Sequence, residues 1–419
     1  MEIHGKLVDI HNRKIYSAAV TVEDGIITKI EPDGHRGEKF ILPGFVDAHI
    51  HLESTYLPPA SLARLAVRHG TIAAVCHPEE MSKALGLSGI EYLIDQARQV
   101  PFKFYFSAPT HSHLSLAEIE ELWEHPEVIS LFALPPETSE LAAKIHSANA
   151  HNKPIMTLPP TTLSEARANR KEGKHILLSD LGTLYPLIQE DPTSCSLCTD
   201  HFPPDKLLLG HIGSLVKRAV ARGIDPIDAI IAATKSPVEH YNLDVGLLRV
   251  GDPADFILVE DLATFRTHAT YIKGNCVFKD EPLFPKVVPK PINRFEAKPI
   301  QELSSDILHK LVKVDRFGKD PIEITPFKTF RLEKGAIAAS RGDSIIGLGS
   351  DDQEIRDALN AVIETQGGLA LSYKGKTQAL PLPIAGLLSD LEGEEMARKY
   401  SDFAEAAKNF GLDEFLTIF

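Results

Sequence analysis

The stretch Ile41-Leu-Pro-Gly-Phe-Val-Asp-Ala-His-Ile-His-Leu-Glu-Ser54 decides how the rest of the chain is interpreted. Its apolar run is broken by Pro43-Gly44 and then resumes, which predicts that one segment ends and a buried strand begins. His49 and His51 lie two residues apart near the end of that strand, so both imidazoles project from one face and can reach the same metal ion. Two buried core histidines would give the same pattern, and the residues alone leave both interpretations open.

Composition restricts the classes of partner. The chain has 419 residues, enough for two or three domains with a sizeable core. It carries 44 Lys and Arg against 58 Asp and Glu, and the net charge of −14 argues against nucleic acid or an anionic membrane as a partner. No apolar run approaches the roughly 18 residues that span a bilayer, and the first residues do not have a signal-peptide pattern. We therefore expect a cytoplasmic protein.

The middle of the chain, residues 44–236, alternates strand-like and helix-like patterns, as the βα units of a TIM-type barrel do. The expected strands are at 45–51, 71–77, 102–108, 128–134, 154–158, 175–180 and 194–200. These are seven strands, and a closed barrel of this type has eight. The missing strand would leave two edges whose backbone groups need other partners.

Short strand patterns flank this segment on both sides. Residues 1–43 and 237–290 have too little apolar surface to form separate cores, so we expect them to combine into one composite β-sandwich. A proline-rich stretch from Phe284 to Ile292 predicts a linker, and a separate α+β domain is expected over 291–419.

Several short sequence motifs resemble those of a known family. The stretch at 43–54 resembles the first-strand signature of the amidohydrolase superfamily, and Leu197-Cys-Thr-Asp200 and Leu209-Gly-His-Ile212 follow in the same order. Lys334-Gly-Ala-Ile-Ala-Ala-Ser340 and Leu380-Pro-Leu-Pro-Ile-Ala-Gly-Leu387 are similar to the C-terminal domain of bacterial adenine deaminases. The resemblance covers nearly the whole chain. It implies an amidohydrolase-type TIM-like barrel with a composite β-sandwich and a C-terminal α+β domain.

The resemblance also implies a reaction, the hydrolysis of adenine to hypoxanthine and ammonia with a divalent metal (Mn, Fe or Zn), one or two ions per chain. Attack on C6 of a purine needs hydroxide at neutral pH, which a divalent metal supplies by lowering the pKa of its water. His49 and His51 would bind the metal, and Asp200 would both contact it and transfer a proton to the leaving amine. Glu53 matches a family glutamate that would contact metal, substrate or neither. His211 matches a family histidine near the site, and a helix cap explains it equally well.

The implied ligand set is incomplete in this chain. Ala133 stands where the family has a metal-bridging glutamate, and a later βα unit that brings a His-Glu pair is absent. A site of His49, His51 and Asp200 alone is sufficient for one metal with an open position. Other side chains are candidates for rebuilding the second half of the centre, namely His77, Glu79, His111, His113, Asp180 and His201.

Two hypotheses about function follow. The first is a divergent adenine deaminase, or a related cyclic-amidine hydrolase, that runs on one metal. The second is an inactive homologue that keeps the fold and acts as a scaffold or as the partner of an active paralogue. In either case we expect a homo-oligomer or a complex with a paralogue, and metal content together with ammonia release from adenine separates the two hypotheses.

Overall fold

The computed structural model describes residues 1–34, 37–110, 114–133, 138–179, 182–327, 335–412 and 416, and it divides the stretch quoted above between two sheets. Strand β4 (Phe40–Pro43) belongs to the first sheet and strand β5 (Phe45–Ile50) to the second, with Gly44 at the corner between them. A β-carbon on Gly44 would lie 2.5 Å from Cδ1 of Ile72, so no larger residue fits there. The strand predicted after the Pro-Gly break is confirmed.

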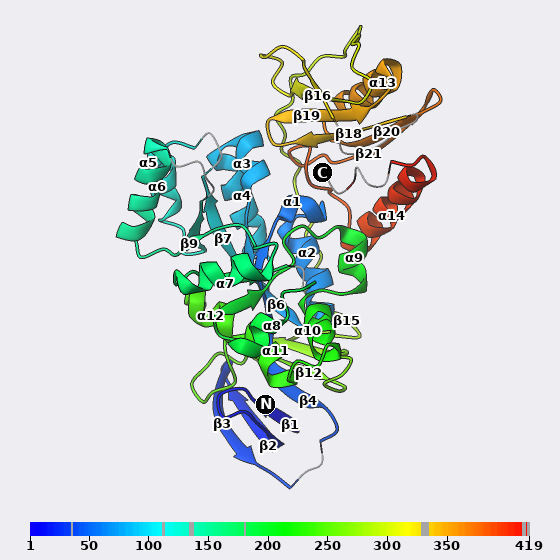
Figure 1. Ribbon diagram of the computed structural model, residues 1–419. Coiled ribbons are helices and arrows are strands. Elements are labelled where there is room, and N and C mark those ends of the chain that lie inside the picture. The colour runs from blue at the N-terminus through cyan, green and yellow to red at the C-terminus, as the bar shows by residue number, and fades with distance from the viewer. Residues whose placement is uncertain are drawn as a thin grey trace.

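The first sheet combines strands from both sides of the barrel segment (Figure 1, lower part). Its strands are β1 (Glu2–Asp9), β2 (Lys14–Glu23), β3 (Ile26–Pro32), β4, β12 (Phe256–Val259), β13 (Thr267–Ile272), β14 (Asn275–Lys279) and β15 (Glu281–Pro282), in the order β15-β14-β13-β12-β4-β1-β2-β3. Strand β4 joins the two halves, because it pairs in parallel with β1 and antiparallel with β12. Apolar side chains from both halves, including Ile41 and Phe256, share one buried cluster, as a composite β-sandwich requires.

The barrel contains all seven predicted strands, although several are shorter than expected. They are β5, β6 (Thr71–Cys76), β7 (Lys103–Pro109), β8 (Val128–Phe132), β9 (Ile155–Met156), β10 (Ile176–Leu178) and β11 (Cys195–Leu197). Strands β5 to β9 form one parallel sheet, and β10 pairs in parallel with β11. A single bridge between Ile50 and Asp200 joins the end of β11 to β5. Within the described residues no strand pairing links β9 to β10, so the barrel is open there.

Helices lie around this barrel and at its mouth (Figure 1). They are α1 (Leu52–Thr55), α2 (Pro59–Ala66), the 3-10 helix η1 (Val67–His69), α3 (Glu79–Leu85), α4 (Leu87–Ala97), α5 (Leu116–Leu122), α6 (Ser139–Ala150), α7 (Leu163–Lys171), α8 (Pro186–Glu190), α9 (Pro204–Leu209), α10 (Ile212–Ala221), α11 (Pro226–Ala233) and α12 (Lys235–Tyr241). Because they cover the outer face, β5 and β6 are buried along their whole length, as parallel strands in α/β folds are. Across the described chain, no helix has the length and apolar character needed to cross a bilayer.

The C-terminal part is an antiparallel sheet with one helix on it and one beside the barrel. The strands are β16 (Lys310–Asp315), β17 (Glu323–Pro326), β18 (Ala336–Arg341), β19 (Ser344–Gly349), β20 (Gly368–Tyr373) and β21 (Lys376–Pro381), in the order β17-β16-β19-β18-β20-β21. Helix α13 (Asp352–Glu364) packs on this sheet, and α14 (Gly393–Asn409) packs on α2 and α9 of the barrel. The sequence pattern at 327–332 also predicts a strand, and residues 328–332 lie outside the described part of the chain. The sheet lies above the carboxyl ends of the barrel strands (Figure 1).

Candidate metal centre

Strand β5 brings His49 and His51 together as the spacing predicted. Their Nε2 atoms lie 3.2 Å apart, and the two rings meet nearly edge to face. The backbone N–H of His49 donates to Oδ1 of Asp47 on the same strand at 3.2 Å. Both imidazoles therefore point to one space at the carboxyl end of β5.

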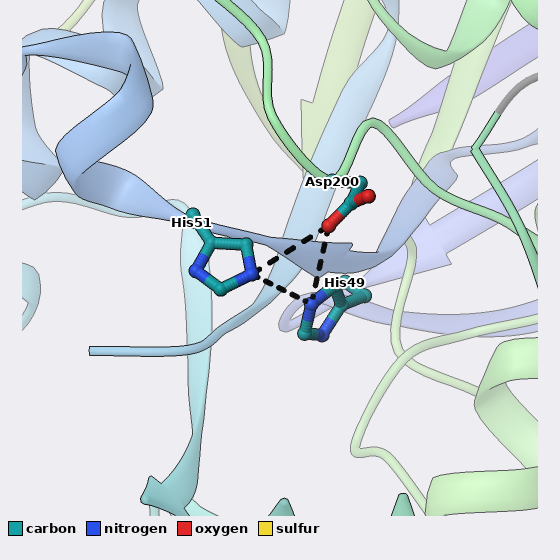
Figure 2. Close-up of side chains that lie close together, drawn as sticks. All are labelled: His49, His51 and Asp200. Carbon is teal, nitrogen blue, oxygen red and sulfur yellow. Dashed lines mark hydrogen bonds and ion pairs between the residues drawn. The ribbon is translucent and has the colours of Figure 1, made fainter. Parts of the chain in front are cut away.

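Asp200 completes the cluster from the end of β11. Its N–H donates to the carbonyl of His49 at 2.9 Å, and its carbonyl accepts from the N–H of His51 at 2.9 Å. This double pairing holds Asp200 at a φ of 58°, a left-handed conformation that aspartate tolerates better than most side chains. Its Oδ1 lies 3.6 Å from Nε2 of His49 and 3.5 Å from Nε2 of His51 (Figure 2). The two histidines and the carboxylate thus face one another across the junction of β5 and β11.

The chemistry of this cluster fits a divalent cation. Oδ1 of Asp200 is buried and has no hydrogen-bond partner, a costly state for a carboxylate oxygen unless something binds it. Burial lowers the pKa of both His49 and His51 well below the ordinary value, which keeps the imidazoles neutral as metal ligands must be. One ligand atom from each of the three residues lies within 4.8 Å of the others. Two imidazoles and one carboxylate suit Zn, Fe or Mn.

A buried polar network lies beneath the cluster. Oδ1 of Asp47 accepts from the N–H of Thr199 at 3.0 Å, and its Oδ2 lies 3.1 Å from Nε2 of His211. The other nitrogen of His211 lies 2.8 Å from the hydroxyl of Thr71. His211 makes no side-chain cap on α10, and its Nε2 lies beside Asp47 without a hydrogen bond. Asp47 fixes Thr199, the residue before Asp200, through the N–H of Thr199. Sequence reasoning did not single out Asp47, although a carboxylate inside a buried strand is the signal of such a network.

Glu53 lies beside the cluster but not in it. Its Oε1 accepts from the N–H of Met81 at 2.9 Å, while its Oε2 is buried without a hydrogen-bond partner. Burial raises the pKa of Glu53 to about 7. With His51 it lines a cavity of about 260 Å³, whose other described lining residues are Ser54, Tyr56, Glu79, Glu80, Lys83, Phe132, Leu158, His201, Ala339, Ser340, Arg341, Leu369 and Leu387. The cavity therefore lies between the barrel mouth and the C-terminal sheet.

The other side of the cluster is aromatic. The ring of Phe132 stacks on His49, with centroids 5.0 Å apart and an interplanar angle of 18°. It also lies 4.2 Å from the ring of His77. Ala133, the next residue after Phe132, is buried and offers no ligand atom. Position 133 therefore does not supply the carboxylate that the resemblance implied.

Among the described candidates for a rebuilt second site, His77, Glu79 and His201 do not form a further group of three close metal-ligating side chains. Nε2 of His77 lies 3.0 Å from Glu79, and Glu79 also pairs with Lys83 of α3 at 2.6 Å. His77 and Glu79 are therefore already paired with protein groups. His201 stacks on the ring of His51 and remains exposed. His111, His113 and Asp180 lie outside the described residues. Within the described chain the cluster of His49, His51 and Asp200 is the one group of three close metal-ligating side chains.

Comparison with known proteins decides the family. The Amidohydrolase family matches residues 40–157 and 136–277, and the Adenine deaminase C-terminal domain matches residues 290–419. The chain is 34% identical to the adenine deaminase of Salinibacter ruber, over 99% of this chain and 93% of that protein. It is 33% identical to the adenine deaminase of Methanosarcina mazei, over 97% and 91%. The chain belongs to the adenine deaminase family.

This adenine deaminase-like amidohydrolase is shorter than its relatives. The alignment with the Salinibacter ruber protein runs over 509 positions, whereas the chain has 419 residues, so at least 90 positions of that alignment are gaps in this chain. The barrel itself is similar to solved structures, which supports the fold alone. One is a beta-aspartyl dipeptidase of Fervidobacterium islandicum (TM-score 0.52, 12% identity, 67% of this chain and 98% of that one). Another is a D-hydantoinase of Thermus sp. (TM-score 0.51, 13% identity, 67% and 96%).

Family membership confirms the resemblance seen in the sequence and the predicted fold class. Members of the amidohydrolase superfamily use divalent metals, and this chain has a His-His-Asp cluster of the matching chemistry at the barrel mouth. The shorter chain agrees with the predicted absence of a βα unit.

Proposed function

We propose that this protein hydrolyses adenine to hypoxanthine and ammonia at a single divalent cation held by His49, His51 and Asp200. The observation that carries the proposal is the buried, unpartnered Oδ1 of Asp200, 3.5 and 3.6 Å from two imidazole nitrogens in a chain of the adenine deaminase family. A divalent cation of the Mn, Fe or Zn type held there would supply hydroxide at neutral pH by lowering the pKa of water.

Asp200 would transfer the proton. In the reaction a C6–O bond forms and the C6–N bond breaks, so one proton must move from the attacking water to the leaving amine. The two backbone hydrogen bonds to β5 fix the Asp200 carboxylate at the cluster. Its carboxylate would take the proton from the water and return it to the amine, which leaves as ammonia.

Glu53 would bind the substrate. One of its oxygens is engaged by the N–H of Met81, which fixes the side chain, and the other has no hydrogen-bond partner. Since Glu53 lines the cavity next to His51, that second oxygen would make a hydrogen bond to the purine ring and orient C6 toward the cluster.

A single cation, not two, is proposed because Phe132 covers the other face of His49 and Ala133 offers no bridging carboxylate. The same loss of ligands is the observation that favours the alternative function, an inactive homologue that serves as a scaffold or partner. One direct measurement distinguishes these two functions.

That measurement is ammonia release from adenine by the purified full chain in buffer supplemented with Mn. We expect turnover by the wild type and a loss of at least about 100-fold in Asp200→Asn, which keeps the size of the side chain but removes the proton acceptor. Asp244→Asn, a change of the same kind at an exposed loop position, is the matched control and should keep full activity. Unchanged turnover in Asp200→Asn would overturn the proposed role of Asp200, and no ammonia from the wild type would identify the inactive homologue.

A further inference from the structure

A second cavity, of about 350 Å³, adjoins the substrate cavity next to His51, and the two share Ser54 and Tyr56 among their lining residues. We call it the tyrosine cavity. Helix α9 contributes Asp205 to its lining and helix α14 contributes Tyr400. These two helices pack on each other beside the barrel mouth (Figure 1). A ligand of sufficient length would therefore occupy both cavities.

Tyr56 and Tyr400 give the tyrosine cavity an aromatic lining, with ring centroids 5.4 Å apart. Tyr56 has a φ of 55°, a left-handed conformation that is uncommon for a bulky side chain. Two backbone hydrogen bonds hold it there. Its N–H donates to the carbonyl of Glu53 at 3.2 Å, and its carbonyl accepts from the N–H of Ser389 at 2.8 Å. Such strain persists where the surroundings fix a residue, and here it keeps Tyr56 in the lining of both cavities.

Asp205 adds a carboxylate that the described part of the protein does not use. Its Oδ1 is buried without a hydrogen-bond partner, and no ion pair to Asp205 is formed within the described residues. Burial and, to a smaller extent, the charge of Asp205 raise the pKa of Tyr56 to about 12. Burial also raises the pKa of Tyr400, again with a contribution from Asp205. The field of this carboxylate thus reaches both phenolic hydroxyls, and a buried carboxylate oxygen without a partner is costly unless a ligand binds it.

The charges around the tyrosine cavity favour an uncharged group that carries hydroxyls. A cation there would lie near Lys206 and Arg341, which also line the cavity, and an anion would lie near Asp205. A hydroxyl avoids both repulsions, because it donates to a carboxylate and exchanges hydrogen bonds in either direction with a phenol. Proteins that bind dinucleotides recognise ribose in this way, through an Asp or Glu that hydrogen-bonds to its hydroxyl. The tyrosine cavity therefore has the chemistry of a sugar site.

We propose that the tyrosine cavity binds the pentose of a purine nucleoside whose base lies in the substrate cavity. The place of the base rests on the proposed function. With C6 directed at the metal cluster, the pentose on N9 would enter the tyrosine cavity past Tyr56, which lines both cavities. Typical ligand pockets span about 300–1,000 Å³, so the substrate cavity of about 260 Å³ is small by itself and the two together are of ordinary size. Adenosine is then a second substrate: the oxygen of water joins C6, the C6–N bond breaks, and the products are inosine and ammonia.

The experiment is equilibrium dialysis of hypoxanthine and inosine against the full chain with Mn. Both are products, so binding is measured without turnover. In the wild type, inosine should bind at least about 10-fold more tightly than hypoxanthine, because a pentose hydroxyl meets a charged acceptor. Asp205→Ala should remove about that factor for inosine and leave hypoxanthine unchanged. 9-Methylhypoxanthine, which has a substituent on N9 but no hydroxyl, should bind the wild type and Asp205→Ala alike.

A second variant keeps the result decisive if Asp205→Ala folds poorly. Tyr400→Phe removes one hydroxyl and should weaken inosine binding by about 2- to 10-fold with no effect on hypoxanthine. Asp402→Ala, at an exposed position of α14 outside the described lining of both cavities, is the matched control and should bind both ligands like the wild type.

Three results would overturn the inference. The first is inosine that binds the wild type no more tightly than hypoxanthine. The second is equal inosine affinity in the wild type, Asp205→Ala and Tyr400→Phe. The third is simultaneous binding of inosine and labelled hypoxanthine, which would show a separate sugar site, whereas a nucleoside that places its base in the substrate cavity should displace hypoxanthine.

This inference and the proposed function fail separately. If the wild type releases ammonia from adenine while inosine binds no more tightly than hypoxanthine, the deaminase function stands and the pentose site is wrong. If inosine binds as predicted but neither adenine nor adenosine releases ammonia, the pentose site stands and the deaminase function is wrong.

Discussion

The barrel has two junctions between its five-stranded sheet and its two-stranded sheet, and they differ sharply. At the closed seam, between β5 and β11, the backbone of Asp200 pairs on both sides of Ile50. There the side chains of His49, His51 and Asp200 face one another. At the open seam, between β9 and β10, no strand pairing joins the described residues. There His240 of α12 stacks on His175 with centroids 3.9 Å apart, and its Nε2 lies 3.2 Å from Sδ of Met156.

The difference indicates which half of an amidohydrolase centre can stay in place when a strand of the barrel is missing. His49, His51 and Asp200 depend on backbone pairing that the shortened chain keeps. The βα unit that the family resemblance implies and this sequence lacks would follow the strand at 154–158, and the barrel is open at that point. A side chain from a neighbouring helix, His240, occupies this seam and supplies packing in place of a strand. We infer that chemistry is confined to the closed seam and that the open seam contributes to stability alone.

Outside the three ligands themselves, the largest effect is expected from the network beneath the closed seam. Asp47→Asn keeps the shape of the side chain but removes one acceptor from the contacts with Thr199 and His211. Residues that orient metal ligands typically cost 10- to 100-fold in metal affinity when changed, and we expect about that loss here. A competition titration of Mn against a chelator measures it, with Asp244→Asn as control. Wild-type affinity in Asp47→Asn would show that the network does not position the ligands.

A smaller effect is expected from the open seam. His240→Ala removes a half-buried ring that contacts Met156 and His175, and should lower the free energy of unfolding by about 1–2 kcal/mol. Metal affinity should stay at the wild-type value, in contrast to Asp47→Asn. Urea unfolding and the same metal titration measure the two quantities, and His146→Ala at an exposed position of α6 is the control. A loss of metal affinity in His240→Ala would break the separation between the two seams.

The smallest effect is a pH dependence at the open seam. Burial lowers the pKa of His175 to about 3 and that of His240 to about 4. Above pH 6.5 both rings are neutral in the folded and the unfolded chain and contribute no pH dependence. Below pH 6.5 the unfolded chain binds protons that the folded chain does not. The free energy of unfolding therefore decreases as the pH is lowered from 6.5 to about 4.

His240→Gln removes one of these groups and should make that fall shallower by about 1 kcal/mol per pH unit. Unfolding curves at pH 7.5, 6 and 5 for the wild type and the variant measure the difference. Buried histidines away from this seam contribute equally to both proteins, so the difference isolates His240 and its effect on His175. Parallel pH profiles would contradict the burial of this ring at the open seam.

The sequence predicted the strands and the cluster, because both depend on local pattern. The spacing of His49 and His51 on a strand and the position of Asp200 at the end of the last strand follow from short segments and from the family resemblance. The contacts of His211 with Asp47, of His240 with Met156 and of Arg341 with the barrel cavity join segments that are far apart in the chain. Such contacts are set by how the layers pack, and no local periodicity encodes them.

The most direct test of the account is the metal-to-protein ratio of the wild type and Asp200→Asn after dialysis against Mn, measured by mass spectrometry. The account predicts about one metal per chain in the wild type, as for a site with three protein ligands and an open position, and almost none in Asp200→Asn. Two metals per chain, none in the wild type, or an equal content in both proteins would contradict the claim that one cation binds at the closed seam.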